Sequence, residues 1–373
     1  MGEKLNIAFF GSSLVSSYWN GAATYYRGIV RALADLGHRV TFYEPDILDR
    51  QKHRDMADPP WAKVVVYRAE SADDAIHAVL AARDADVVIK ASGVGAFDDV
   101  LDREVLELQS SDTVVAFWDV DAPATLARVR DQPGDAFGKL IPRYDCILTY
   151  GGGEPVVQAY MALGAQRCVP IYNALDPSTH YPVATDPRYW CDLVFLGNRL
   201  PDRERRVEEF FLIVAECLPD RVFVLGGNGW EGRTLPKNVI RLGHVPTKEH
   251  NALNSSATAV LNISRDSMAS TGFSPATRVF EAAGAAACII TDQWDGIEMF
   301  LDPGGEVLVA RNGEEVVNHL ERLHREDAEM IGAAARRLIL GEHTYCRRAL
   351  ETAEVFESLR SARRVSARET VRR

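Results

Sequence analysis

Short apolar runs rich in Val, Ile and Leu alternate with amphipathic segments of helical length along most of this chain. Uninterrupted apolar strands of this kind are typical of a parallel sheet, because helical crossovers bury both of its faces. In the first half, the pattern predicts strands at 6–10, 39–43, 63–67, 86–89, 113–117, 145–149 and 168–171. The helices expected between them include 22–36, 72–82, 98–109 and 154–163.

Residues 172–189 break this alternation, since they hold three prolines and several turn-forming residues without any period. We interpret 175–190 as a linker between two domains. Beyond it, the pattern predicts strands at 192–196, 222–225, 239–242, 258–263, 287–291 and 307–309. Helices are expected at 204–217, 248–255, 277–283, 314–324 and 327–340, followed by a last helix at 345–360 and a basic, flexible tail at 361–373.

The fold class predicted from this pattern is α/β, with two doubly wound Rossmann-like domains at 1–174 and 191–344. A length of 373 residues also favours two domains. With 47% apolar and 25% charged residues, the composition is that of an ordinary globular protein. The net charge of −11 argues against general binding to nucleic acid or to an anionic membrane.

Several common functions find no support in the sequence. No apolar run approaches the roughly 20 residues of a transmembrane helix, and the N-terminus enters a strand pattern without a signal-peptide region. The six cysteines show no C-x-x-C pair, so we expect buried free thiols in a cytoplasmic protein. The nine histidines show no H-x-x-x-H or H-E-x-x-H spacing, which argues against a metal site. The first loop reads G-S-S-L-V-S rather than G-x-G-x-x-G, so no NAD or FAD cofactor is expected.

Ligands bind at the carboxyl ends of the strands in α/β sheets, so the loops there hold the candidate site residues. A long serine-rich loop after the first strand could contact a substrate or simply connect two elements. Its candidate residues are Ser12, Ser13, Asn20 and Gly21. After the fifth strand, Asp121 is well placed to cap the next helix, whereas Asp119 has no such duty. Both aspartates are candidates for a catalytic base.

The second domain offers cationic and glycine-rich loops. Arginines beside a helix N-terminus suit a diphosphate, since they supply fixed donors and permanent charge. Glycines let the backbone approach a ligand but equally serve a tight turn. The candidates for diphosphate binding are Asn198, Arg199, Arg203, Gly226 and Gly227. Arg206 lies further into the helix and could simply pair with Glu209, and His244 could touch a phosphate or a base or be structural.

Residues 262–310 form the stretch around which the chain is organised, with two polar loops between well-patterned elements. Pro275 suits the first turn of a helix, because its missing N–H would have no partner there. A buried strand and an acidic turn follow this helix. The candidates for binding a nucleoside and a sugar are Arg265, Ser274, Arg278, Glu281, Asp295, Gly296 and Glu298.

Three segments of the second half carry a resemblance to a known family: FLGNRLPDRERRVEEFF, LGHVPTKEHNALNSSATAVLNISRD and TRVFEAAGAAACIITDQWDGIEMFLDPGGEVLV. They resemble the C-terminal domain of the CgeB-like (spore-maturation-protein type) glycosyltransferases, within the wider family-4-like GT-B group. The first half shows a looser cue, NGAATYYRGIVRALADLGHRV. The resemblance covers most of the chain and is more specific in the C-terminal part.

The resemblance implies a GT-B fold, with two domains that face each other across a cleft and a last helix that crosses back to the first domain. It implies that a nucleotide-sugar donor, with a UDP-sugar slightly favoured, binds the second domain. The acceptor, a small molecule, a glycan or a peptide, would bind the first. Glu281 would accept hydrogen bonds from the ribose hydroxyls. The turn from Asp295 to Glu298 resembles the family's glycine-glutamate turn, although the helix dipole alone explains Glu298.

The chain departs from the family at one position. Many retaining members place a second glutamate eight positions before the ribose-binding one, where this chain has Phe273. Their stereochemistry therefore does not carry over, and an inverting enzyme would need a base such as Asp119 or Asp121. We expect a metal-independent, hexosyltransferase-type enzyme, because cationic side chains can stabilise the departing diphosphate. The alternatives are a GT-B-type sugar-nucleotide epimerase and a non-catalytic sugar-nucleotide-binding protein.

Overall fold

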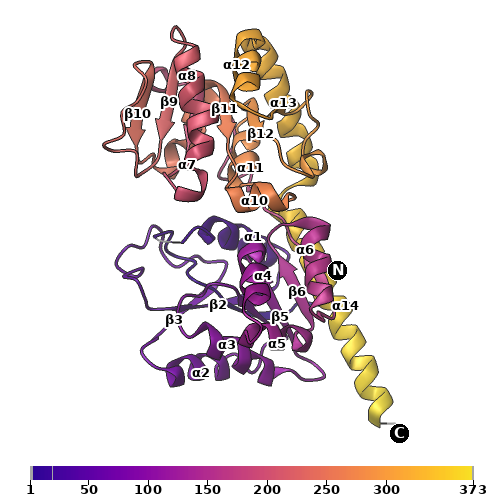
Figure 1. The fold of residues 1–373 in the computed structure, drawn as a ribbon. Coiled ribbons are helices and arrows are strands. Elements are labelled where there is room, and N and C mark those ends of the chain that lie inside the picture. Colours follow the sequence, from indigo (N-terminus) through magenta and orange to yellow (C-terminus); the bar gives the residue numbers. More distant parts are fainter. Residues whose placement is uncertain (1–2, 19, 372–373) are drawn as a thin grey trace. The chain divides into compact units, whose positions relative to one another are not determined.

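The computed structural model describes residues 3–18 and 20–371, with side chains up to Val365, and the chain folds into two compact units (Figure 1). The first unit comprises Met1–Tyr172 and Tyr345–Arg373, and the second comprises Asn173–Thr344. Each unit is built on one sheet of parallel strands. The alternation of apolar strands and amphipathic helices in the sequence thus produces two parallel sheets.

The first unit has a seven-stranded sheet with the order β3-β2-β1-β4-β5-β6-β7. Its strands are β1 (Asn6–Phe10), β2 (Arg39–Pro45), β3 (Lys63–Tyr67), β4 (Val87–Ala91), β5 (Val114–Asp119), β6 (Cys146–Thr149) and β7 (Cys168–Pro170). Its helices are α1 (Ala23–Asp35), α2 (Ala72–Leu80), α3 (Asp98–Glu104), η1 (Val105–Leu108), α4 (Ala122–Asp131), α5 (Ala136–Leu140), η2 (Ile141–Arg143), α6 (Gly153–Ala162) and α14 (Tyr345–Val371). The strand order reverses between β1 and β4, and ligands of α/β sheets bind at such a switch point.

Both faces of this sheet are covered, because neighbouring strand residues point to opposite sides. On one face, Phe10 and Phe117 join the core formed with α2, α3, α5 and α6. On the other face, Phe9 packs against Tyr26 of α1 and against Trp118, with ring centroids 5.4 and 5.6 Å away. The continuous apolar strands of the sequence are explained by this burial on both sides.

The second unit has a six-stranded sheet with the order β10-β9-β8-β11-β12-β13. Its strands are β8 (Cys191–Leu196), β9 (Phe223–Gly226), β10 (Val239–Gly243), β11 (Ala257–Asn262), β12 (Ile289–Asp292) and β13 (Leu308–Ala310). Its helices are η3 (Pro187–Tyr189), α7 (Pro201–Val207), η4 (Glu208–Leu212), α8 (Ile213–Cys217), η5 (Thr247–Glu249), α9 (His250–Ser256), α10 (Asp266–Thr271), α11 (Thr277–Gly284), η6 (Ile297–Met299), α12 (Gly313–Arg322) and α13 (Arg325–Glu342). The strand order of this sheet reverses between β8 and β11.

The strand boundaries agree with the sequence pattern to within about two residues, whereas some helices and loops differ. The helix expected at 204–217 contains a π-helical turn, η4, between α7 and α8. Part of the polar loop expected before α11 is helical and forms α10. Residues 175–190, interpreted as a linker, lie within the second unit. There the backbone N–H groups of Val183 and Asp186 donate to Ser255 and Ser256 of α9, at 3.2 and 2.8 Å.

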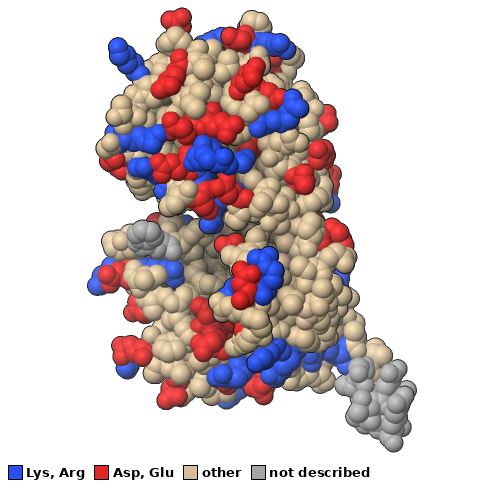
Figure 2. Space-filling view, viewed as in Figure 1, with Lys and Arg blue, Asp and Glu red and all other residues tan. Residues whose placement is uncertain are grey.

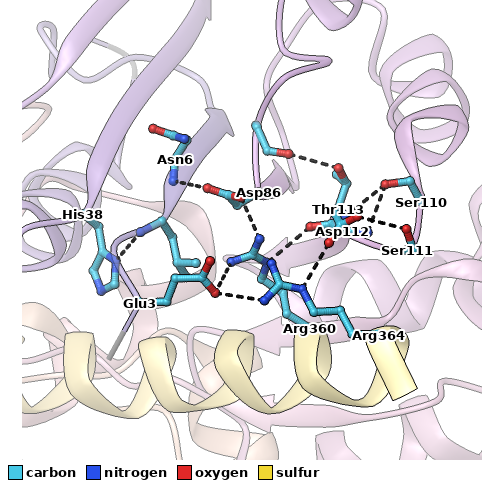
Figure 3. A network of polar contacts seen from close by, with 12 residues as sticks. Glu3, Asn6, His38, Asp86, Ser110, Ser111, Asp112, Thr113, Arg360 and Arg364 are labelled. Carbon is cyan, nitrogen blue, oxygen red and sulfur yellow. Dashed lines mark hydrogen bonds and ion pairs between the residues drawn. The ribbon is translucent and has the colours of Figure 1, made fainter. Parts of the chain in front are cut away.

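Helix α14 belongs to the first unit, and it continues through residues 361–371 that were expected to form a flexible tail. The side chain of Arg360 is only 4% exposed, and it donates to Glu3 at 2.9 Å and to Asp86 at 2.7 Å (Figure 3). Arg364 donates to the Asp112 carboxylate at 3.1 Å. These arginines therefore neutralise carboxylates of their own unit.

Two further sequence expectations concern the environment of the protein. Within the described part of the chain, no helix is both long enough and apolar enough to cross a membrane. The cysteines at 146, 168, 191 and 288 are buried, as expected for free thiols in the core. Cys217 and Cys346 are exposed.

The substitution Arg360→Ala should destabilise the first unit by about 3–5 kcal/mol, because it leaves the carboxylate of Asp86 without its buried partner. Urea denaturation followed by circular dichroism measures the loss as a lower midpoint. Arg364→Ala is the matched control on the same helix, since its side chain is 40% exposed and its removal should leave the midpoint nearly unchanged. Equal midpoints for the two variants would contradict the anchoring role of Arg360.

Candidate functional site

Two guanidinium groups lie together at the carboxyl end of β8. Arg203 of α7 and Arg278 of α11 both lie over the ring of Phe195, at 5.3 and 5.2 Å from its centroid. Arg203 donates to the carbonyl of Asn198 at 2.7 Å, and Arg278 donates to the side chain of Asn262 at 3.1 Å. Contacts with an aromatic face and with neutral acceptors orient these cations without cancelling their charge.

No carboxylate of the described residues makes a direct ion pair with these cations. Among the described residues, neither Arg203 nor Arg278 makes an ion pair, and the nearby buried Asp292 is already paired with Arg206 at 2.5 Å. Burial and the charge of Arg203 lower the pKa of Arg278 to about 9, so the side chain stays charged at neutral pH. Two partly desolvated positive charges in this arrangement favour a ligand with more than one negative charge.

Glycines allow the loops after β8 and β9 to approach each other. The N–H of Gly197 donates to the carbonyl of Gly226 at 2.9 Å. Gly227 has a φ of +117°, and a Cβ there would lie 2.3 Å from the carbonyl oxygen of Gly197. A Cβ on Gly197 itself would lie 2.8 Å from Nη2 of Arg203 and 3.1 Å from Nη2 of Arg278. The glycines therefore serve the packing of the two loops and leave the space that the guanidinium groups occupy.

The other polar candidates of these loops are engaged with protein partners. Arg199 pairs with Glu204 at 2.5 Å, and Arg265 pairs with Asp202 at 2.6 Å. The side chain of Asn198 accepts a backbone N–H from the loop after β9 at 2.9 Å. Figure 2 shows that basic and acidic side chains lie side by side on the face of the second unit that carries α7. These pairs stabilise the loop.

Glu281 follows Arg278 by three residues on α11, so the two side chains lie on neighbouring positions of the helix surface. Its side chain is 21% exposed, and its Oε1 lies 4.0 Å from Nε2 of His180. His250 of α9 lies at the same place, with one nitrogen or oxygen of each of the three residues within 4.8 Å of the others. Burial lowers the pKa of His250. Glu281 is therefore a carboxylate acceptor beside the two cations.

The turn after β12 packs on the loop before α11. Phe273 has a φ of +49°, and its N–H donates to the carbonyl of Asp295 at 2.6 Å. Gly296 has a φ of +87°, and a Cβ there would lie 2.2 Å from the Phe273 ring. Ser274 is buried, whereas Asp295 and Glu298 are exposed beside the short helix η6. An aromatic ring thus fills the position where the resembled family often carries a glutamate.

In the first unit, the predicted residues of the loop after β1 hold the loop itself. Ser12 donates to the side chain of Asn20 at 2.8 Å, and Asn20 donates to the carbonyl of Ser13 at 2.7 Å. Ser13 donates to the buried carboxylate of Glu44 at 3.0 Å. Gly21 has open space where a Cβ would lie. These contacts connect Ser12, Ser13 and Asn20 to one another and to Glu44.

A cavity of about 450 Å³ lies beside this loop. Its polar lining includes Ser12, Asn20, Gly21, Arg50, Ser92 and Asp121. A larger hollow of about 700 Å³ lies around the first residues of β1, β2 and β3, at the amino ends of the strands. The smaller cavity is the better candidate for a substrate site, because ligands of α/β sheets bind at the carboxyl ends.

At the end of β5, Asp119 has the structural role that the sequence suggested for Asp121, and Asp121 is the exposed aspartate. Asp119 is fully buried, and it accepts hydrogen bonds from the N–H of Asp121 at 3.0 Å, from Thr125 at 3.1 Å and from Tyr160. Asp121 is exposed, and its side chain makes no helix-capping hydrogen bond. Asp121 occupies the N-cap position of α4, as predicted, but the expected capping by its side chain is absent, and the carboxylate of Asp119 instead accepts from Asp121 N–H and from Thr125. Asp121 is the better candidate for a base.

Residues 203–354 match the protein family described as glycosyl transferase-like. HepE from Anabaena, solved in complex with UDP and glucose, is similar with a TM-score of 0.68 at 12% identity, over 95% of this chain and 100% of that chain. Sucrose-phosphate synthase from Thermosynechococcus elongatus gives 0.67 at 14%, over 96% and 100% of the two chains. A glycosyltransferase of avilamycin A biosynthesis gives 0.59 at 19%, over 96% and 98%. No curated protein sequence matches this chain.

The chain has the GT-B glycosyltransferase fold. This result confirms the fold class predicted from the sequence, and the matched region contains Arg203, Arg278 and Glu281. The fold brings these three predicted residues together at the switch point between β8 and β11. Arg199 and Arg265 pair with carboxylates instead, and His244 is exposed just after β10.

Sequence reasoning missed several residues of this glycosyltransferase fold. His180 lies in the proline-rich segment taken for a linker, and His250 follows it by 70 positions, so no local motif reveals their meeting. Arg206 pairs with Asp292, 86 positions away, and the expected pairing with Glu209 is wrong. The sequence did contain a signal that Phe195 belongs to the site, because an aromatic residue at the end of a predicted strand precedes the arginine-rich loop.

Proposed function

We propose that this protein transfers a hexosyl group from a UDP-sugar to a hydroxyl or amine acceptor, and that it is a CgeB-like member of the GT-B glycosyltransferases. The observation that carries the proposal is the pair of cations without a direct ion-pair partner, Arg203 and Arg278, with the carboxylate of Glu281 on the same helix as Arg278. The similar HepE structures contain UDP, glucose and UDP-glucose, which supports a uridine donor.

The two arginines would hold the diphosphate of the donor. Negative charge grows on the diphosphate as the bond between the anomeric carbon and the phosphate oxygen breaks. Guanidinium groups that are already fixed against Phe195 can stabilise this charge without reorganisation. In this proposal the arginines supply the positive charge at the leaving group, so the reaction is metal-independent.

Glu281 would bind the ribose of the same donor. A carboxylate can accept hydrogen bonds from both hydroxyls of a cis-diol. Arg278 and Glu281 are three residues apart on α11, which corresponds to a rise of about 4.5 Å along the helix. One helix would thus present a cation to the diphosphate and, one turn later, an anion to the ribose.

The cavity of the first unit would hold the acceptor, and Asp121 would act as the base. The acceptor oxygen would form a bond to the anomeric carbon while the bond to the diphosphate breaks, and the acceptor proton would pass to Asp121. Asp119 does not suit this role, since three donors already occupy its carboxylate. The exposed position of Asp121 in the cavity lining supports this assignment.

UDP should bind the purified protein, and Arg203→Ala and Arg278→Ala should each weaken binding at least about tenfold, as expected for the loss of a charge-assisted hydrogen bond. Gly197→Ala should act in the same direction, because its methyl group displaces both guanidinium groups. Isothermal titration calorimetry with UDP, GDP, dTDP, ADP and CMP measures the affinities and identifies the base.

Arg205→Ala is the matched control for this titration, because Arg205 lies on the exposed side of α7 and its loss removes the same charge. Its affinity for UDP should equal that of the wild type. Equal losses of UDP affinity in Arg205→Ala and Arg203→Ala would mean that only the net charge of the unit affects binding. If none of the five nucleotides binds, the proposed function fails.

The role of Glu281 predicts a specific coupling to the ribose. Replacement of UDP by 2′-deoxy-UDP should weaken binding about tenfold in the wild-type protein, because one hydrogen bond to the carboxylate is lost. In Glu281→Ala, the two nucleotides should bind equally, which a double-mutant cycle measures as a coupling free energy. If Glu281→Ala still binds UDP more tightly than 2′-deoxy-UDP, by the same factor as the wild type, then another residue binds the ribose.

The role of Asp121 predicts a loss of turnover without a loss of binding. Asp121→Asn should lower the rate of UDP release from UDP-glucose about 100-fold or more, as expected for the loss of a general base. Its affinity for UDP should stay at the wild-type value. Asp119→Ala should instead lower the denaturation midpoint, since buried donors such as the Tyr160 hydroxyl lose their acceptor.

The products of this assay also separate the alternatives. Free UDP together with a glycosylated acceptor or free glucose supports a transferase. An epimerised UDP-sugar without free UDP would favour the epimerase. Tight binding of the donor without any turnover, tested with glucose and a panel of simple glycans as acceptors, would favour a non-catalytic binding protein.

A further inference from the structure

Three side chains from separate segments of the second unit meet beside the arginine pair. His180 comes from the proline-rich segment, His250 from the start of α9 and Glu281 from α11. One nitrogen or oxygen of each lies within 4.8 Å of the others, and Nε2 of His180 lies 4.0 Å from Oε1 of Glu281. The side chain of His180 is only 5% exposed.

The hydrogen bonds around His180 define which ring nitrogen carries its proton. Nδ1 lies 3.0 Å from the hydroxyl oxygen of Thr179, and this hydroxyl donates its one hydrogen to the carbonyl of Asp176 at 3.0 Å. When the hydroxyl donates in this direction, its oxygen accepts from His180, and Nδ1 holds the proton of the neutral ring. Nε2 of His180 then carries a lone pair and faces Glu281.

The same reasoning applies to His250. Its Nε2 lies 3.2 Å from the carbonyl oxygen of Val245, which can only accept a hydrogen bond. Nε2 is therefore the donor, and Nδ1 carries a lone pair. Nε2 of His180 and Nδ1 of His250 are both buried, and neither has a hydrogen-bond partner among the described residues. Each ring thus has one buried nitrogen without a hydrogen-bond partner, and one ligand atom of each of the three residues lies within 4.8 Å of the others.

We propose that His180, His250 and Glu281 form a binding site for a divalent transition metal ion, with zinc as the best match. Two imidazole nitrogens and one carboxylate oxygen are a usual zinc ligand set, with a fourth position left to water. The three atoms would need to approach to about 3.3 Å from one another, as metal–ligand distances of about 2.0–2.2 Å require. The other nitrogen of each ring already has an oxygen partner, in Thr179 and in the Val245 carbonyl, as is usual for histidines that bind a metal.

The site has a consequence for the donor, and this part rests on the proposed function. Glu281 cannot give its carboxylate oxygens both to zinc and to the ribose hydroxyls. Zinc and UDP should therefore compete, so that zinc acts as an inhibitor of nucleotide binding and has no part in the transfer reaction.

Zinc binding is tested on tag-free, full-length protein after treatment with a chelator and removal of the chelator. The exposed thiols of Cys217 and Cys346 are blocked by alkylation, because they could bind zinc on their own. We expect one Zn²⁺ per chain by calorimetry and elemental analysis, and a visible d–d absorption with Co²⁺. His180→Gln and His250→Gln should each lower the zinc affinity at least tenfold.

His77→Gln is the control, since this exposed histidine lies in the first unit on α2. It should bind zinc as the wild type does. The proposal is overturned if the wild type binds no zinc at 100 μM, or if the two variants bind it as tightly as the wild type does. Circular dichroism of the metal-free variants shows whether they are folded, and Glu281→Gln provides a third variant that keeps the side-chain volume.

The competition is measured separately by titrating UDP with and without zinc. The apparent affinity for UDP should fall at least tenfold in the wild type and remain unchanged in His180→Gln. If zinc binds and the UDP affinity does not change, the competition is overturned while the metal site stands. If zinc binds and no nucleotide does, the proposed function fails and the metal site is upheld.

Discussion

The close approach of two loops constrains the carboxyl edge of the second sheet. The carbonyl oxygen of Gly197 accepts the indole N–H of Trp230 at 2.8 Å and lies where a side chain on Gly227 would have to be. On the other side of Gly197, the same lack of a side chain leaves room for Arg203 and Arg278. Glycine at 227 therefore permits the contact between the two loops, and glycine at 197 leaves the space in which the two positive charges lie.

Three arginines lie in this region, and their partners separate a structural role from a binding role. Arg206 is held by the buried carboxylate of Asp292, which also accepts the N–H of Ser264, so this pair joins α7 to β12 and the loop after β11. Arg203 and Arg278 have an aromatic ring and neutral oxygens instead. Two partly buried like charges that lack a direct ion-pair partner repel each other in the free protein, and a bound polyanion would reduce this cost. This difference supports the proposal that Arg203 and Arg278 bind the ligand, whereas Arg206 pairs with Asp292 within the fold.

The sequence predicts the fold well because the fold depends on periodicity. Strands buried on both faces must be apolar throughout, and helices that cover them must have one apolar side, so both leave a local record. The partners of polar groups leave no such record. Asp119 and Asp121 are two residues apart after the same strand, yet the direction of the chain there buries one and exposes the other. His180 meets Glu281 only because residues 175–190 bind to α9, and neither the prolines nor the spacing of the histidines indicates this contact.

The turn between β12 and η6 likewise depends on a contact that leaves no local record in the sequence. Phe273 adopts a left-handed backbone conformation, which costs a residue with a side chain about 1–2 kcal/mol, and its ring lies on the Cα of Gly296. Packing must offset this strain, so Phe273 and Gly296 depend on each other and form one structural unit. A glutamate at position 273 would lose the aromatic contact with the glycine. In this chain an apolar contact therefore positions the turn. Glu281 is then the acidic side chain of α11 that lies near the arginine pair. In the proposed reaction the base would come from the first unit, and the exposed Asp121 suits this role better than the buried Asp119.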